Sequence, residues 1–228
     1  VEHLLPKYVK WPSLRQQYQI EKHYRDTNNF PGVVGCIDGT HIPIRKPPSD
    51  ESPDSYYNNR LKNYSIVMQV TANPDKSFSH VAAGAPGSVH DARIFKKSDL
   101  WFENGQRIDE FFPDPRFHLI ADSAYMTKQY ILPPFKRYGI ITAGHNKFNK
   151  VHASVRNVVE CAIGALKGRF KRLIHVNLHC PEQATKIALA CATLHNFCIE
   201  LNDITNQEHR DPEDVNPPLN VDQVFGED

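Results

Sequence analysis

Short apolar runs bounded by turn residues dominate the middle of the chain, and their lengths and β-branched content predict strands. The first run, Gly32–Asp38, continues after a short break at Ile42–Arg45. The turn signal at residues 73–75 (Asn-Pro-Asp) separates the next two runs, which predicts an antiparallel hairpin. We expect a five-stranded sheet whose other strands are Ser65–Thr71, Phe78–Ala83, Phe117–Ala121 and Gly139–Ala143.

Three stretches have the apolar spacing of helices: about Val89–Lys97, Ser154–Lys171 and Pro181–Leu201. Ser88 and Asp91 fit a capping box at the start of the first helix, and that structural role takes precedence over metal binding by Asp91. Strands in hairpins followed by helix, strand, helix, strand and helix make an α/β order. A mixed sheet flanked by helices is therefore the expected fold class.

The two ends of the chain differ from this middle part. Residues 1–30 predict a helical lead-in, because apolar positions recur among charged ones and Pro12 suits a helix start. Residues 31–201 hold nearly all the apolar runs and form the expected domain. Residues 202–228 are polar, acidic and proline-bearing, which predicts a disordered tail. A chain that begins at Val1 without an initiator Met is expected to be a piece of a longer protein.

Composition narrows the class of protein. The chain has 228 residues, of which 40% are hydrophobic and 23% charged, as in ordinary globular proteins with a sizeable core. A net charge of +1 gives no overall argument for nucleic acid, although an even balance can hide a segregated one. No apolar run approaches the roughly 18–20 residues of a membrane span, so no membrane partner is expected. Five cysteines at irregular spacing favour a reducing compartment over a disulfide framework.

Two of the predicted strands end in an aspartate: Asp38 after the first run and Asp122 after the run at 117–121. Ligands of open α/β sheets gather at the carboxyl ends of strands, so these carboxylates would lie side by side if the two strands were neighbours. Like charges at that range repel unless a divalent cation lies between them. Oxygen ligands without a nearby His or Cys suit Mg²⁺ or Mn²⁺ better than Zn²⁺.

A third carboxylate, Glu160, lies at the border of the apolar face of the helix predicted over residues 154–171. From that border it can reach over the edge of the sheet toward a ligand. Gly164, one turn later, leaves room for the ligand at a cost of about 1 kcal/mol in helix propensity. Basic side chains on and beyond this helix predict a row that binds DNA phosphates: Arg156, Lys167, Arg169, Lys171 and Arg172.

Each of these residues also has a structural interpretation that the sequence leaves open. Asp38 can simply start a turn, and Asp122 can cap a helix that begins at Ser123. Glu160 can form an ordinary surface ion pair with Arg156, one helical turn away. The basic row can be a solvated face or a localisation signal.

Five motifs occur in order along the chain: GCIDGTHIPI, PGSVHDARIF, LIADSAY, RNVVECAIGALKGRF and LHNF. Together they resemble the DDE endonuclease domain of PIF/Harbinger-type transposases and their domesticated relatives, over roughly residues 10–200. One such motif is weak evidence, whereas five in register are specific. The resemblance implies an RNase H-like fold whose catalytic, metal-binding carboxylates are Asp38, Asp122 and Glu160. The alanines of ADSAY stand where many relatives have glycines.

The resemblance also implies a reaction and partners. Two Mg²⁺ or Mn²⁺ ions would activate a nucleophile and stabilise the leaving 3′-oxygen of a DNA phosphodiester. Water as nucleophile gives strand nicking, and a 3′-hydroxyl end gives strand transfer. Relatives usually work with a Myb-like DNA-binding partner, so we expect a nuclear protein, with the cytoplasm and a homo-oligomer left open. The alternative is a domesticated module that binds DNA or protein without turnover; the presence of all three carboxylates favours the enzyme.

Overall fold

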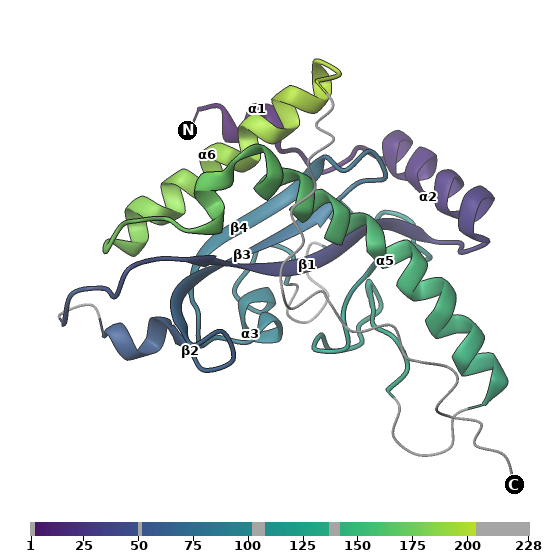
Figure 1. Ribbon diagram of the computed structural model, residues 1–228. Helices are drawn as coiled ribbons and strands as arrows, with labels where there is room; N and C mark the ends of the chain where they lie inside the picture. The colour runs from purple at the N-terminus through teal and green to yellow at the C-terminus, as the bar shows by residue number, and fades with distance from the viewer. Residues whose placement is uncertain (1–2, 50–51, 102–107, 137–141, 204–228) are drawn as a thin grey trace, which may run out of the picture.

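A computed structural model describes residues 3–49, 52–101, 108–136 and 142–203 (Figure 1). Nearly all of the predicted acidic tail lies outside these residues. So does most of the predicted strand Gly139–Ala143, whose last residue begins a helix instead. None of the described helices combines the length and apolar character that crossing a membrane requires.

One mixed sheet of six strands forms the centre of the fold. Strands β1, β3 and β4 pair antiparallel as consecutive neighbours, and the predicted hairpin is β3–β4. Strands β5 and β6 continue the sheet on the other side of β1 and run parallel to it. The strands are β1 (Val33–Pro43), β2 (Tyr57–Asn58), β3 (Asn63–Ala72), β4 (Phe78–Pro86), β5 (His118–Ile120) and β6 (Ile131–Leu132).

Two predictions about the strands were wrong. The break expected after Asp38 does not exist, because pairing with β3 runs without interruption from Cys36 opposite Ala72 to Pro43 opposite Ser65. The backbone hydrogen bonds between β1 and β3 keep the polar residues after Asp38 in the strand, although the apolar pattern indicated that the strand ended there. The predicted count of five strands missed β2 and β6, which have two residues each and are too short to show a pattern.

The helices are α1 (Leu5–Tyr8), α2 (Leu14–Asn28), α3 (Asp91–Phe95), α4 (Ile108–Phe111), α5 (Ala143–Arg169) and α6 (Pro181–Glu200), with short 3₁₀ helices at Pro53–Tyr56 (η2) and Lys171–Ile174 (η4). Helix α5 begins eleven residues before its predicted start, where Thr142 and His145 form a capping box. Its first turns are polar and lack an apolar stripe, which is why periodicity did not reveal them. The capping box predicted from Ser88 is absent, since the N-cap of α3 is His90.

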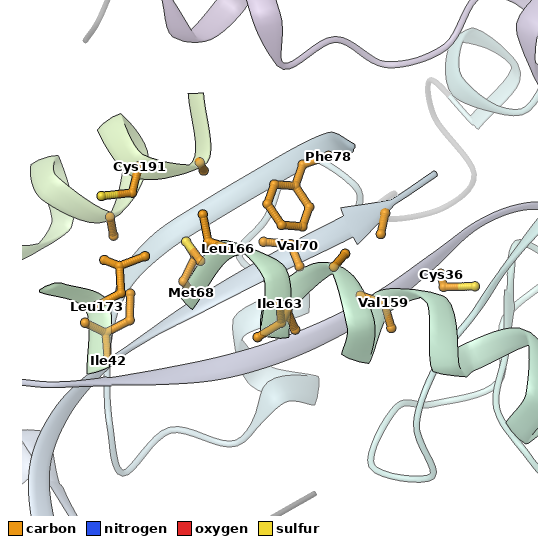
Figure 2. Close-up of a cluster of buried hydrophobic side chains, with 14 of the residues drawn as sticks. Cys36, Ile42, Met68, Val70, Phe78, Val159, Ile163, Leu166, Leu173 and Cys191 are labelled. Atoms are coloured by element: carbon orange, nitrogen blue, oxygen red, sulfur yellow. The ribbon is translucent and has the colours of Figure 1, made fainter. Parts of the chain in front are cut away.

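Helices α5 and α6 cover one face of the sheet, and α3 lies on the other (Figure 1). Figure 2 shows the core on the first face, where Met68 and Phe78 from the strands meet Ile163 and Leu166 from α5. A second, largely aromatic cluster fills the opposite face and includes Phe95, Phe112, Phe117, Tyr125 and Tyr130. The sheet is therefore buried on both sides, which suits its nearly continuous apolar strands.

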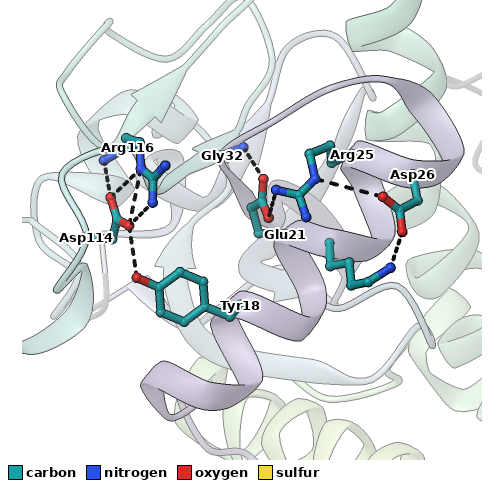
Figure 3. A network of polar contacts seen from close by, with 8 residues as sticks. Tyr18, Glu21, Arg25, Asp26, Gly32, Asp114 and Arg116 are labelled. Atoms are coloured by element: carbon teal, nitrogen blue, oxygen red, sulfur yellow. Dashed lines mark hydrogen bonds and ion pairs between the residues drawn. The ribbon is translucent and has the colours of Figure 1, made fainter.

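Helix α2, part of the predicted lead-in, is tied to the domain by polar contacts (Figure 3). The buried carboxylate of Glu21 accepts a hydrogen bond from the backbone N–H of Gly32, just before β1. The hydroxyl of Tyr18 donates to Asp114, which also pairs with Arg116 ahead of β5. The helix thus contacts the entries of the two strands that carry the predicted catalytic aspartates.

The LHNF motif has a structural role in α6. The side-chain amide of Asn196 accepts a hydrogen bond from the backbone N–H of Phe78 at 2.8 Å and donates to the Phe78 carbonyl at 2.7 Å. The same amide donates to the carbonyl of Tyr8, so one side chain joins α6 to β4 and to α1. His195 contacts the carbonyl of Lys76 through its Nε2 atom.

We expect Asn196→Ala to lower the free energy of unfolding by about 2 kcal/mol or more. The substitution leaves the buried backbone N–H and C=O of Phe78 without this partner, and each lost pairing of that kind costs about 1–3 kcal/mol. Urea denaturation measures the change. Asn157→Ala, at an exposed position of α5, is the matched control and should change stability by less than about 0.5 kcal/mol. Equal stabilities for the two variants would contradict the structural role of the motif.

Candidate active site

Asp38 and Asp122 occupy equivalent positions on neighbouring strands. Strand β5 lies parallel to β1 with Cys36 opposite Ile120, and each aspartate comes two residues later. Asp38 lies inside β1, opposite Val70 of β3, so it does not start a turn. Asp122 follows the end of β5, where its carbonyl accepts a hydrogen bond from Tyr125 N–H in a turn, and no helix begins there. Both structural alternatives are thereby removed.

A cavity of about 600 Å³ opens at this edge of the sheet. It is bordered by β1, by the segments around β2 and before α3, by the turn after β5, and by α5. All three predicted catalytic carboxylates line it, together with one carboxylate that the sequence had assigned elsewhere. Its titratable lining residues are Asp38, His41, Tyr57, Arg60, His90, Asp91, Asp122, Arg156 and Glu160.

Asp91 lies against the backbone of β1. A Cβ atom added to Gly39 would lie only 2.2 Å from the Oδ1 atom of Asp91, so any larger residue at that position would displace the Asp91 side chain. Asp91 therefore sits beside Asp38 in the cavity, and the predicted capping role of Asp91 was wrong. The sequence signal was present in the glycine after Asp38, but only the packing of α3 on β1 identifies which side chain needs the space.

The pKa of Asp38 is raised to about 7, chiefly by burial and to a smaller extent by the nearby negative charges of Asp91 and Asp122. Its side chain is only 16% exposed. Two contacts oppose the rise in pKa: the charge of Arg156, and the N–H of Gly39, which donates to Oδ1 at 2.8 Å. Burial also raises the pKa of Asp91, with Asp122 as the next contributor. The cavity thus gathers carboxyl groups whose negative charge is poorly compensated.

Arg156 joins the first and third predicted carboxylates. Its Nη1 atom donates to Oδ2 of Asp38 at 2.8 Å, and its Nη2 atom donates to Oε1 of Glu160, one turn later on α5. The expected ion pair between Arg156 and Glu160 therefore exists. It lies at the cavity, with Arg156 24% and Glu160 27% exposed, and it extends to Asp38. A pair so placed is less screened by solvent than a surface pair.

The basic row predicted from the sequence is divided in the structure. Lys167 is only 2% exposed, and its ammonium donates to the carbonyl of His41 in β1, so it is not placed to bind a phosphate. The stripe of α5 that carries Glu160 faces β1, and Lys167 follows it seven residues later on the same side. Arg169 pairs with Asp203. Lys171 and Arg172 remain exposed on η4.

The oxygen donors of the cavity suit a hard cation such as Mg²⁺ or Mn²⁺. Asp38 and Asp122 fit such an ion best, because their strands bring them to equivalent positions and their like negative charges repel each other. The guanidinium of Arg156 bridges the carboxylates of Glu160 and Asp38. Accordingly, no group of three or more His, Cys, Asp or Glu side chains is arranged to hold a metal within the described ranges.

We expect the stability of the metal-free protein to depend on pH through Asp38. Its folded pKa of about 7 lies above the ordinary value of 3.8, so the native state binds the extra proton between these values. The contribution to stability is then present below about pH 4 and is lost as the pH rises toward 7, at about 1.36 kcal/mol per unit.

Urea denaturation between pH 4 and 8 checks this sign. Asp38→Asn should remove this component, so the variant should lose less stability than the wild type across that range. Asp54→Asn, at an exposed position, controls for the loss of one charge and should follow the wild type. Parallel pH profiles for Asp38→Asn and the wild type would show that Asp38 titrates alike in the folded and unfolded states.

Comparison with known proteins identifies similar sequences. The profile of a family described as DDE superfamily endonuclease matches residues 37–196. An Arabidopsis thaliana protein named "Protein ALP1-like" is 29% identical over 209 residues, which cover 87% of this chain and 50% of that protein. "Putative nuclease HARBI1" is 28% identical in Rattus norvegicus, covering 75% of this chain and 47% of the rat protein.

The human protein of the same name is 24% identical over 200 residues, which cover 85% of this chain and 54% of its own length. The chain thus spans about half the length of the curated relatives it matches. No solved structure matches the chain significantly.

Proposed function

Because the chain belongs to the DDE superfamily endonucleases, with Harbinger-derived relatives, we propose that it cuts or joins DNA phosphodiester bonds in a metal-dependent reaction. The family match confirms the resemblance seen in the five motifs. One observation carries the metal-dependent part of the proposal: Asp38 and Asp122, at equivalent positions on neighbouring strands, line one cavity with Asp91, and burial and the nearby negative charges raise the pKa of Asp38. Such a group of carboxylates gains stability from a divalent cation.

The strand order supports an RNase H-like fold as part of this proposal. Three antiparallel strands in chain order, β1, β3 and β4, are followed by β5 and β6, which lie parallel to β1 on its other side. That order makes β1 the central strand and places β5 next to it. The first and second carboxylates of the triad then come from adjacent strands, and the third comes from a helix that covers one face.

In this proposal Asp38 and Asp122 would hold Mg²⁺ or Mn²⁺. Glu160 would become a further ligand of the cation once Arg156 releases Asp38 and Glu160. The bound cation would lower the pKa of a water molecule and stabilise charge on the leaving oxygen. Arg156 supplies the positive charge that the carboxylates need before that release. Released from Asp38, its guanidinium remains at the cavity and can pair with a DNA phosphate, for which its planar fork is well suited.

A second candidate is a module that binds DNA or protein without turnover. The observation in its favour is that Arg156 already pairs with both Asp38 and Glu160, as a permanent internal cation would. A buried ion pair of this kind can be retained for structural reasons alone. The two candidates differ in whether the carboxylates bind a metal and whether Glu160 affects the chemical step.

The wider biological setting also belongs to the proposal. An enzyme acting on chromosomal DNA would work in the nucleus. Recognition of particular DNA ends by a Myb-like partner protein is part of the same proposal.

We expect Glu160→Gln to lower the rate of DNA nicking by three decades or more in Mg²⁺ or Mn²⁺. The substitution keeps the size of the side chain but removes the negative charge that would help hold the metal. A displaced metal would no longer stabilise the charge that develops in the transition state, and each decade of rate corresponds to about 1.36 kcal/mol of barrier. Stability should change little, because the side chain lies at the border of the apolar face. Single-turnover cleavage of family-type terminal-repeat DNA measures the effect, with the partner protein supplied where cleavage requires it.

Glu200→Gln, at the exposed end of α6, is the control and should cleave like the wild type. Nicking by Glu160→Gln within a few-fold of the wild type would contradict the proposed triad. Metal-independent DNA binding without any cleavage, in the wild type and both variants, would favour the binding module.

A further inference from the structure

Acidic residues are absent from the stretch of chain between two of the carboxylates, Asp122 and Glu160. Residues 123–159 contain six Lys or Arg and no Asp or Glu, while the rest of the chain carries 21 basic and 26 acidic residues. The even overall charge hides this difference. Lys136, Lys147 and Lys150 of this segment are exposed. Exposed lysines of this segment would attract a polyanion such as DNA.

Lys147 and Lys150 lie in the first half of α5, which extends beyond the sheet (Figure 1). Helix geometry relates it to the cavity. Asn149 precedes Glu160 by eleven residues, which is three turns within about 20°, so both lie on one side of the helix. At about 1.5 Å per residue, they are about 16 Å apart along the axis. A strand leaving the cavity along α5 would therefore pass Asn149.

Phe135 is an exposed aromatic ring held rigidly at this point. Its side chain is 47% exposed, yet its backbone is bonded twice to Asn149: Phe135 N–H donates to Oδ1 and Nδ2 donates to the Phe135 carbonyl, each at 2.9 Å. The ring stacks on His145, with centroids 4.3 Å apart and planes 28° apart, and meets the edge of Phe148. Single exposed apolar residues are common, but this ring stacks on a second ring, its backbone is bonded to α5, and the exposed Lys136 follows it directly in the chain.

We propose that the Phe135–His145 pair is a stacking platform for an unpaired nucleobase of the DNA strand whose phosphate occupies the cavity. Aromatic rings beside cations are how proteins hold single-stranded nucleic acid without reading its sequence. Lys136 and Lys150 bind the phosphates next to that base. A base within a duplex has both faces covered, so the platform selects a strand that is locally unpaired. This inference rests on the proposed function, because the cavity fixes where the strand lies.

Fluorescence anisotropy can test the platform with two DNA probes: a blunt duplex and the same duplex with a six-nucleotide overhang. We expect the wild type to prefer the overhang. Phe135→Leu should weaken overhang binding roughly tenfold and leave blunt binding unchanged, as loss of one stacked base predicts. Phe135→Trp should retain the preference. Tyr18→Leu, at a similarly exposed aromatic of α2, is the control and should bind like the wild type.

The charged part of the surface is tested separately. Lys136→Gln with Lys150→Gln should weaken both probes and reduce their salt dependence. A photoreactive 5-iododeoxyuridine in the overhang should cross-link to the peptide that contains Phe135. Melting temperatures of all variants identify any that fail to fold, in which case Phe135→Trp and the cross-link decide the question.

An overhang preference absent in the wild type, or unchanged in Phe135→Leu, would overturn the platform. Metal-dependent cleavage is measured on the same probes. Cleavage with no effect of Phe135 refutes the platform alone, whereas a Phe135-dependent preference without cleavage refutes the proposed nuclease alone.

Discussion

The buried negative charge of Asp38 is the constraint on which the arrangement of this fold depends. Asp38 stands in the central strand of a sheet covered on both faces, where an unpaired carboxylate is costly. It gains compensation from the Gly39 N–H and from Arg156, which reaches it from α5. The same helix is fixed further along by Lys167, whose ammonium donates to the carbonyl of His41. Two cations of α5 thus hold the helix along β1, and this placement brings Glu160 to the cavity.

The negative charge of Asp38 would also allow a divalent cation to replace Arg156 as its partner in the cavity. Asp91 and Asp122 add negative charge beside Asp38, and the lack of a side chain at Gly39 lets α3 come close enough for Asp91 to do so. Arg156 compensates part of that charge while keeping Asp38 and Glu160 joined. In the proposed enzyme a divalent ion takes over this compensation, and the basic first half of α5 guides the DNA strand. The same carboxylates would therefore pair with Arg156 in the metal-free protein and bind the divalent ion in the active enzyme.

The sequence predicted the parts of the site that depend on local pattern. Asp38 and Asp122 were identifiable because each follows an apolar run, and Glu160 because helical periodicity places it at the border of an apolar face. Features that depend on tertiary contacts were missed. The pairing of β1 with β3 carries the strand past Asp38, and the close approach of α3 turns Asp91 from an expected cap into a cavity residue. The burial of Lys167 follows from the docking of α5 on β1, which residue spacing alone does not fix. Helix α5 begins early at a cap whose first turns are too polar to show periodicity.

Anomalous diffraction from crystals of the protein with Mn²⁺ would test whether Asp38 and Asp122 bind a divalent cation. We expect a manganese peak bonded to carboxylate oxygens of Asp38 and Asp122, with the guanidinium of Arg156 moved away from Asp38. Crystals of Asp38→Asn under the same conditions should lack the peak. A well-ordered cavity without manganese, in which Arg156 still joins Asp38 to Glu160 at saturating Mn²⁺, would contradict metal binding at this site and identify the arginine as its permanent cation.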